Sequence, residues 1–198
     1  MTVLVYVLLA YLLGSVSFAV ISSWLFKLPD PRTYGSKNPG ATNVLRSGKK
    51  AAAVLTLLGD AGKGLLAVVL AQSFGLANEV IAAVALAVFL GHVFPVFLKF
   101  QGGKGVATAV GVLLGLNLWV GLLAMATWLL VVMIWRISSL SALVAAVLTP
   151  IYAVIFIGIN AMMLSVLAIS LLLIWRHQSN IVNLLAGKET RIGKSSAP

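Results

Sequence analysis

Two long stretches without a charged side chain, Thr2–Phe26 and Val106–Trp135, most strongly limit how this chain can fold. A helix needs about 20 apolar residues to cross the ~30 Å hydrocarbon core of a bilayer, so each stretch is long enough to span it. The whole chain is 61% hydrophobic and only 9% charged, whereas a soluble domain carries about 25% charged residues. We therefore expect a multi-pass integral membrane protein.

Seven apolar segments are predicted to be membrane-spanning helices, because backbone exposed to lipid must satisfy its own hydrogen bonds. The sequence contains no recognisable internal repeat and no long linker, so we expect one membrane-embedded domain over residues 1–198. The predicted fold class is all-α. The predicted spans are residues 3–25, 51–72, 79–98, 106–116, 118–135, 140–157 and 160–175.

The stretch Val106–Trp135 is predicted to form a hairpin of two helices. One continuous helix would be about 45 Å long, too long for a single untilted crossing. With a turn at Gly115–Asn117, thirteen of the 14 Lys and Arg residues fall on one side of the membrane, and only Lys63 lies within a span. The thirteen are Lys27, Arg32, Lys37, Arg46, Lys49, Lys50, Lys99, Lys104, Arg136, Arg176, Lys188, Arg191 and Lys194. The positive-inside rule then predicts an outside N-terminus and a cytoplasmic C-terminus.

The net charge of +10 would suggest nucleic-acid binding in a soluble protein. In a membrane protein the positive-inside rule explains most of it, and grouped basic residues can also hold an anionic substrate or lipid head groups. The absence of Cys excludes disulfides and thiolate catalysis, and two distant His residues with four carboxylates offer few metal ligands. We expect no nucleic acid, no metal, no cofactor and no obligate protein partner.

The first polar segment, GSKNPGATNVLR at residues 35–46, combines groups that suit a phosphate. Its hydroxyl and amide side chains can donate hydrogen bonds, and Arg46 can make a two-pronged contact with an anion. The simpler interpretation is a capped turn, with Thr42 or Asn43 as the helix N-cap and Arg46 as an anchor at the membrane surface. The candidate site residues are Ser36, Asn38, Gly40, Thr42, Asn43 and Arg46.

The second polar segment, QGGKGVAT at residues 101–108, places glycines around a lysine just before a predicted helix. Exposed backbone N–H groups and a helix N-terminus favour an anion. The spacing of a Walker A motif is missing, so ATP binding gains little support. A glycine-rich turn between spans is the alternative. The candidates are Gly102, Gly103, Lys104, Gly105 and Thr108.

The third polar segment, RHQSNIVNLLAGKE at residues 176–189, follows the last span. His177 is the only His outside the apolar segments, which makes it the acid–base candidate. Asn180 and Glu189 are further candidates. An amphipathic tail at the membrane surface would also fit this segment.

Two ionisable residues lie inside a predicted span, Asp60 and Lys63, at a spacing that allows them to pair along one helix face. Such residues are costly in a membrane and often functional. A structural ion pair that orients the second span is the preferred interpretation. His92 is likewise expected to be a hydrogen-bonding packing residue.

Motifs spread over nearly the whole chain form a specific combination. They are AYLLGS at 10–15, SxNPGATNVLR at 36–46, DxxKG at 60–64, GHVFPVF at 91–97, GGKGVAT at 102–108 and RHxxNIxxLxxGxE at 176–189. Together they resemble the bacterial acyl-phosphate:glycerol-3-phosphate acyltransferases, the PlsY family. Two positions depart from the family pattern, because Lys37 stands where Gly is usual and Asn183 where a basic residue is usual.

The resemblance implies transfer of a fatty acyl group from acyl phosphate to the 1-hydroxyl of glycerol 3-phosphate. The products would be 1-acylglycerol 3-phosphate (lysophosphatidic acid) and inorganic phosphate, the first acylation of phospholipid synthesis. It implies a bacterial inner-membrane enzyme whose site faces the cytoplasm, with membrane lipid as its surroundings. Neither acyl-CoA nor acyl-carrier protein would be the direct donor.

An acyl phosphate has a good leaving group, so we expect direct transfer without a covalent intermediate. The base would be an oxygen of the donor phosphate, with His177 as the competing base. A nucleophilic Ser36 would need a His–carboxylate relay, which the sequence does not suggest. The expected catalytic set is Ser36, Arg46, Lys104, His177 and Asn180, and the remaining candidates would bind substrate.

The main alternative is a transporter of a small phosphate ester, since broken helices and basic loops can also line a transport site. Its site would lie near the midplane of the membrane. The polar residues gather instead at one predicted face, which favours an enzyme at the membrane boundary.

Overall fold

The computed structural model describes residues 2–192 of the chain. Every regular element in this range is helical, which confirms the predicted all-α class. The α-helices are α1 (Thr2–Ser15), α2 (Phe18–Leu25), α3 (Ala41–Leu45), α4 (Lys50–Ser73), α5 (Asn78–Val93), α6 (Val106–Leu116), α7 (Leu118–Trp135), α8 (Ser138–Ile157), α9 (Ala161–Arg176) and α10 (Gln178–Leu185), with a 3₁₀ turn, η1, at Val96–Leu98.

Five predicted spans are each formed by one helix whose bounds agree with the prediction to within two residues. The third, predicted over residues 79–98, consists of α5 and, after a break at residues 94–95, the turn η1. Five segments within residues 2–192 are long and apolar enough to cross a membrane. Helix α6 is shorter, as expected, and α9 reaches the required length only together with α10, from which it bends by 57°. A multi-pass membrane protein is confirmed, and the count of seven crossings stays a prediction.

The hairpin predicted within Val106–Trp135 is present. Asn117 ends α6 and begins α7, where its Oδ1 accepts hydrogen bonds from the backbone N–H groups of Trp119 and Val120 at 3.0 and 3.2 Å. One side chain thus satisfies two of the backbone donors left unpaired at the start of a helix. Gln72 of α4 also donates to the carbonyl of Gly115 and ties the hairpin to the rest of the bundle.

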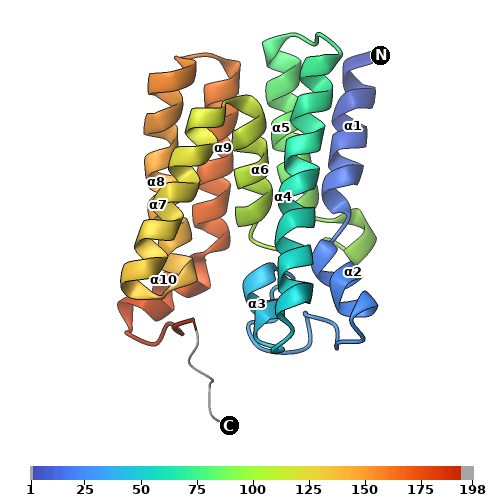
Figure 1. Cartoon of the computed structure of the whole chain (residues 1–198). Coiled ribbons are helices and arrows are strands. Elements are labelled where there is room, and N and C mark those ends of the chain that lie inside the picture. Colours follow the sequence, from blue (N-terminus) through green and yellow to red (C-terminus); the bar gives the residue numbers. More distant parts are fainter. Residues whose placement is uncertain (1, 193–198) are drawn as a thin grey trace.

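The two ends of the bundle differ in charge. Figure 1 places the start of α1 at one end, together with the α4–α5, α6–α7 and α8–α9 connections, and α3 and α10 at the other, here called the C-terminal end. The connections rich in basic residues, including those around α3 and between α7 and α8, lie at the C-terminal end (Figure 1). Lys194, one of the basic residues used in the prediction, lies outside the described residues.

The first predicted span is broken into α1 and α2 at Val16–Ser17, although the sequence suggested one continuous helix. The ion pair in α4 satisfies backbone groups freed by this break. Lys63 Nζ donates to the carbonyl of Val16 at 2.6 Å, and Asp60 Oδ1 accepts from the N–H of Phe18 at 3.5 Å. The predicted pairing of Asp60 with Lys63 is confirmed at 2.9 Å. A broken helix is tolerated in lipid when such partners replace its lost hydrogen bonds.

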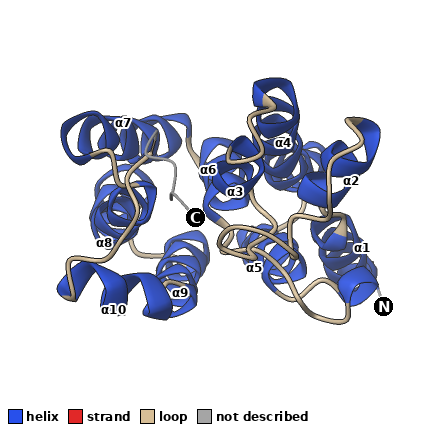
Figure 2. Cartoon of the chain, turned by 90° about the horizontal axis from the view of Figure 1, so that it is seen from below, coloured by secondary structure: helices blue, strands red, loops and turns tan. Residues whose placement is uncertain are grey.

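Figure 2 shows the bundle along its axis, with α1, α2, α4 and α5 on one side, α7 to α10 on the other, and α6 between them. Small residues allow close packing at this centre: a Cβ at Gly111 of α6 would lie only 1.8 Å from the carbonyl of Ala61 in α4. Helices in membranes associate through such close contacts, because burial in lipid gives them no hydrophobic drive to pair. Because α6 is central, the glycine-rich segment that precedes it lies between the two groups of helices.

Candidate active site

A chain of hydrogen bonds, here called the polar junction, joins Lys104, Asn180, Glu189 and Ser139. Lys104 Nζ donates to Asn180 Oδ1. Asn180 Nδ2 donates to Glu189 Oε1 at 2.7 Å, and Ser139 Oγ donates to the same oxygen at 2.9 Å. The glycine-rich segment, α10, the C-terminal segment and the start of α8 therefore meet at one point. Sequence reasoning missed Ser139, because no motif contains it and only folding brings α8 to this place.

Positive charge converges on the polar junction. Burial lowers the pKa of Lys104, the nearby Glu189 carboxylate raises it, and Arg176 and Arg46 lower it further. Three cationic side chains thus lie close enough to influence one another around a single carboxylate. Such an excess of fixed positive charge in a partly desolvated place favours an anionic ligand.

The first polar segment reaches this site through two contacts. Arg46 Nη2 donates to Thr190 Oγ1 at 2.8 Å, next to Glu189 in the chain. The hydroxyl of Thr42 lies 3.2 Å from that of Ser138, next to Ser139. The structure therefore brings all three predicted segments together. Thr190 and Ser138 were not predicted, since neither stands out from ordinary loop residues in the sequence.

The interior of the first segment differs from the prediction. Gly40 is the N-cap of α3, so the predicted capping by Thr42 or Asn43 is wrong. Asn43 is buried instead, and its Nδ2 donates to the carbonyls of Pro31 and Tyr34. Its Oδ1 accepts from the N–H of Ser36 at 3.0 Å. Because both amide hydrogens are already donated, Asn43 shapes the segment, and its predicted contact with substrate stays a prediction.

The other members of the first segment lie on its accessible side. Ser36 is exposed, and Asn38 is half-buried with its carbonyl accepting from the N–H of Gly40 at 2.9 Å. Lys37 between them has a left-handed backbone with φ of 55°, a conformation that favours glycine. The backbone at position 37 therefore has a conformation that a glycine would adopt without strain.

His177 is almost fully buried between α9 and α10. Its Nδ1 lies 2.8 Å from the carbonyl of Leu173, and since a carbonyl only accepts, Nδ1 carries the proton. Burial lowers the pKa of His177 to about 4, and Lys104 also lowers it, although the bond to Leu173 raises it. The ring is therefore neutral near pH 7, and the lone pair of Nε2 can accept a hydrogen bond.

The glycine-rich segment is held from two directions. Arg176 Nη2 donates to the carbonyl of Gly102 at 3.2 Å, and its guanidinium lies over the rings of Phe94 and Trp175. The N–H of Gly103 donates to the carbonyl of His92 at 3.2 Å. The prediction counted Arg176 only as a charge at the membrane surface, although its position next to His177 in the RH motif was a usable signal.

Thr108 lies apart from these contacts. It is fully buried in α6, where its carbonyl would be 2.4 Å from a Cβ at Gly64 of α4. Within residues 2–192 its hydroxyl has no hydrogen-bond partner. Gly105 is the N-cap of α6 and links Lys104 to the helix. Its predicted contact with substrate and that of Thr108 stay predictions.

An apolar groove opens beside the polar junction, between α6, α7, α8 and α9. It is partly open to the surroundings, and its lining is almost entirely apolar. One end begins at Val106, two residues after Lys104, and at Leu173, whose carbonyl holds His177. The groove is lined by Val106, Ala109, Val110, Leu113, Ala124, Trp128, Ala142, Ala145, Ala146, Thr149, Val166, Ile169, Ser170 and Leu173. It suits a long apolar chain attached to a charged head.

In the part of the chain that the structure describes, no three or more His, Cys, Asp or Glu side chains come together as metal ligands would. The polar junction instead joins the ammonium of Lys104, the amide of Asn180 and the hydroxyl of Ser139 around the Glu189 carboxylate. The ammonium, the amide and the hydroxyl can each donate a hydrogen bond. These are donors to a phosphate.

Comparison with known proteins gives concordant results for sequence and structure. A family model described as glycerol-3-phosphate acyltransferase matches residues 4–187. A glycerol-3-phosphate acyltransferase of Nitrosomonas eutropha is 66% identical over 191 residues, which cover 94% of this chain and 96% of the relative. One of Nitrosospira multiformis is 64% identical over 200 residues, with 99% of each chain covered.

Two solved structures are similar throughout. One is the glycerol 3-phosphate form of PlsY (YgiH), an integral membrane glycerol 3-phosphate acyltransferase, with a TM-score of 0.91 and 37% identity. The other is its lysophosphatidic acid form, with a TM-score of 0.90 and 36% identity. In both cases the match covers 98% of this chain and 96% of the solved one.

Proposed function

The chain belongs to the glycerol-3-phosphate acyltransferase family, and from that premise we propose that it transfers a fatty acyl group from acyl phosphate to glycerol 3-phosphate. The acceptor would be the 1-hydroxyl of glycerol 3-phosphate. The products would be 1-acylglycerol 3-phosphate, a lysophosphatidic acid, and inorganic phosphate.

The observation that carries this proposal is the meeting of a cationic polar junction with an apolar groove. An acyl phosphate has a phosphate head and a long hydrocarbon tail. Lys104 at the junction suits the head, and the groove that begins at Val106 suits the tail. The acyl carbon of a donor bound in this way lies between the two, beside His177 and Asn180.

Acyl transfer then requires orientation more than a strong base. The acceptor oxygen forms a bond to the acyl carbon, the bond from that carbon to the phosphate oxygen breaks, and the acceptor proton moves to an oxygen of the departing phosphate. A neutral His177 with a pKa of about 4 is a weak base at pH 7, which favours the donor phosphate as proton acceptor. His177 Nε2 would accept a hydrogen bond from the other hydroxyl of glycerol 3-phosphate and so orient the attacking one, whose proton stays free to move to the phosphate.

The cations have separable tasks in this scheme. Lys104 stabilises the negative charge that grows on the leaving phosphate, and Arg46 binds a second phosphate group near the exposed edge of the site. Ser36 and Asn38 lie on the accessible side of the first segment, where they can donate to the acceptor. Glu189 holds Asn180 through a hydrogen bond at 2.7 Å, so we assign it to positioning within the site.

We further propose seven crossings, with the site at the cytoplasmic face of the bacterial inner membrane. The basic connections gathered at the C-terminal end of the bundle support this orientation through the positive-inside rule (Figure 1). The water-soluble acceptor would then enter from the cytoplasm, and the donor would enter from the bilayer.

The test is a donor comparison with purified protein in detergent. Glycerol 3-phosphate is supplied with either palmitoyl phosphate or palmitoyl-CoA, and the lysophosphatidic acid formed is measured by mass spectrometry. We expect product with palmitoyl phosphate only, and product with palmitoyl-CoA at a similar rate would contradict the proposed donor. Uptake of labelled glycerol 3-phosphate into sealed vesicles without any donor would instead support a transporter.

A further inference from the structure

A second buried polar cluster lies outside the polar junction and has no role in the transfer described so far. Asp60 and Lys63 of α4 and His92 of α5 are 1%, 3% and 7% exposed. His92 Nδ1 lies 3.5 Å from Asp60 Oδ1, the oxygen that also receives Lys63 Nζ at 2.9 Å. Burying three ionisable groups in a membrane bundle is costly, so the cluster calls for a physical reason.

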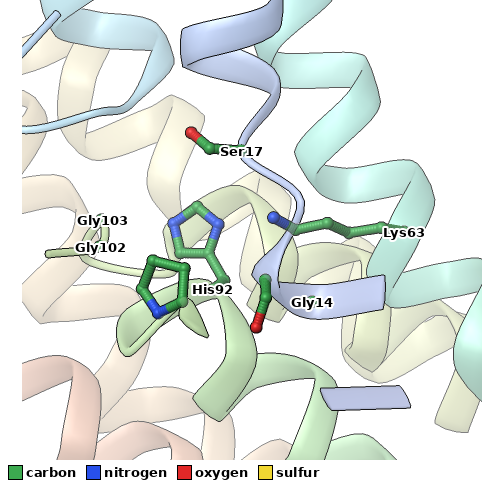
Figure 3. Close-up of a pocket in the computed structure, with 8 residues that line it drawn as sticks. Gly14, Ser17, Lys63, His92, Gly102 and Gly103 are labelled. Atoms are coloured by element: carbon green, nitrogen blue, oxygen red, sulfur yellow. The ribbon is translucent and has the colours of Figure 1, made fainter. Parts of the chain in front are cut away.

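The break between α1 and α2 explains two of the three residues. Lys63 satisfies the carbonyl of Val16, and Asp60 lies within reach of the N–H of Phe18. His92 makes no bond to this break among the described residues. Its side chain lies in a pocket that is also lined by Lys63 and by the glycine-rich segment at Gly102 and Gly103 (Figure 3).

His92 meets the glycine-rich segment through both its backbone and its ring. Its carbonyl accepts from the N–H of Gly103 at 3.2 Å. Its Nε2 fills the space beside Gly103, because a Cβ at that glycine would lie only 2.3 Å from it. Figure 3 shows the ring of His92 between Lys63 and the Gly102–Gly103 backbone, in the pocket that these residues share.

We propose that Asp60, Lys63 and His92 are positioning residues for acyl transfer, which fix Gly103 and thereby the adjacent Lys104. This inference rests on the proposed function of Lys104. Asp60 Oδ1 lies 3.5 Å from Nδ1 of His92, the other edge of the ring lies beside Gly103, and Gly103 precedes Lys104 in the chain. Arg176 holds the carbonyl of Gly102 on the far side, so the segment is fixed between two anchors.

Anchoring Gly103 through His92 would matter because it places the positive charge of Lys104. Lys104 stands on an irregular segment without helical hydrogen bonds of its own, so its position depends on what the segment packs against. A misplacement of about 1 Å at a catalytic group can lower a rate by about a hundredfold. The buried ion pair is joined to α4, the longest helix in the described chain, and gives His92 a rigid support.

The test compares two substitutions of similar size, His92→Asn and His92→Leu. An Asn amide can occupy the place of Nδ1 and still donate to Asp60, whereas Leu cannot. The control is Ser22→Ala, which removes a different buried bond of α4, that between the hydroxyls of Ser22 and Thr56 at 2.6 Å. For each variant we would measure kcat and KM for both substrates, and the rise in unfolding temperature caused by glycerol 3-phosphate.

The proposal predicts that His92→Leu lowers kcat/KM by about 10- to 100-fold and weakens the thermal stabilisation by glycerol 3-phosphate. His92→Asn keeps a donor for Asp60 but lacks the ring edge beside Gly103, so its kcat/KM should fall between those of His92→Leu and wild type. Ser22→Ala should keep wild-type kinetics whatever its stability. Equal kinetics for His92→Leu and wild type would overturn the proposal, as would an equal loss in Ser22→Ala.

A replacement variant and a second readout cover the cases in which the main comparison fails. If His92→Leu does not fold, His92→Gln takes its place, because its longer amide reaches toward Gly103 and no longer donates to Asp60. A Gln variant with wild-type kinetics would overturn the proposal. If wild type makes no lysophosphatidic acid from acyl phosphate, the proposed function fails. The thermal stabilisation by glycerol 3-phosphate still tests the positioning of the anion site by His92.

Discussion

Lys104 donates a hydrogen bond to the side-chain oxygen of Asn180, 76 positions further along the chain. This bond joins the glycine-rich segment before α6 to the helix that follows the last predicted span. The Nδ2 of Asn180 in turn donates a hydrogen bond to Glu189 Oε1. An amide is well suited to this place, because it accepts from a cation on one side and donates to a carboxylate on the other.

Asn180→Ala should therefore lower kcat/KM for acyl transfer by about a hundredfold or more, since Lys104 loses the partner that orients it. The matched control is Ser179→Ala, at an exposed neighbouring position of the same helix. It should keep activity near wild type. Steady-state kinetics with palmitoyl phosphate and glycerol 3-phosphate check both variants, and equal activity in the two would contradict the role given to Asn180.

His177 should stay neutral across the physiological range. Nitrogen-15 NMR of protein labelled at histidine should show its ring titrating near pH 4, the value to which burial lowers its pKa. The chain has only two His residues, so the spectrum of His177→Asn assigns the signal. A titration midpoint near 6.5 would contradict the buried neutral ring.

The same shift has a consequence for stability. The unfolded chain binds a proton at His177 near pH 6.5, whereas the folded protein does so only near pH 4. The contribution of this residue to stability is therefore complete above pH 6.5 and is lost as the pH falls from 6.5 to 4. Unfolding temperature measured over this interval should fall less steeply in His177→Asn than in wild type.

Much of this fold could be predicted from the sequence because the solvent is lipid. Charge-free runs long enough to cross a bilayer can only be helices, and the placement of Lys and Arg decided that Val106–Trp135 is a hairpin. The pairing of Asp60 with Lys63 followed from their spacing on one helix. Each of these predictions depends on the order and spacing of residues along the chain and needs no knowledge of contacts between distant segments.

What escaped prediction depends on contacts between distant segments. The break at Val16–Ser17 is stable because α4 supplies partners for it, and no signal within the first span required this. Ser139 belongs to the polar junction only because α8 begins beside the C-terminal segment. His92 is buried and hydrogen-bonded as predicted, but its neighbours Asp60 and Gly103 could not be foreseen, because they come from other parts of the chain.

The unusual Lys37 offers a test of backbone strain. Its φ of 55° is left-handed, and a side chain in this region costs about 1–2 kcal/mol relative to glycine. Lys37→Gly should therefore raise the free energy of unfolding by about 1 kcal/mol, less the extra freedom that glycine gives the unfolded chain. The control is Lys50→Gly, at an exposed helical position, which should lower it. Unfolding in detergent measures both, and a loss of stability in Lys37→Gly would contradict the strain.

The apolar groove predicts a change of acyl-chain preference. Ala145 lines the groove on α8, and Ala145→Leu should shorten the space available to the chain. The ratio of kcat/KM for palmitoyl phosphate to that for decanoyl phosphate should fall about tenfold, within the range that a few methylene groups provide. Val147→Leu, on the exposed face of the same helix, serves as the control and should leave the ratio unchanged. An unchanged ratio in Ala145→Leu would mean that the acyl chain of the donor does not bind in this groove.

The measurement that tests the central claim most directly follows both products of one reaction. Purified wild type and Lys104→Gln are given palmitoyl phosphate and glycerol 3-phosphate, and inorganic phosphate and lysophosphatidic acid are measured over time. We predict that wild type releases the two in equal amounts and that Lys104→Gln, while still folded, releases both about a hundredfold more slowly or worse. Phosphate release without lysophosphatidic acid in wild type, or undiminished transfer in Lys104→Gln, would contradict an acyl transfer centred on the polar junction.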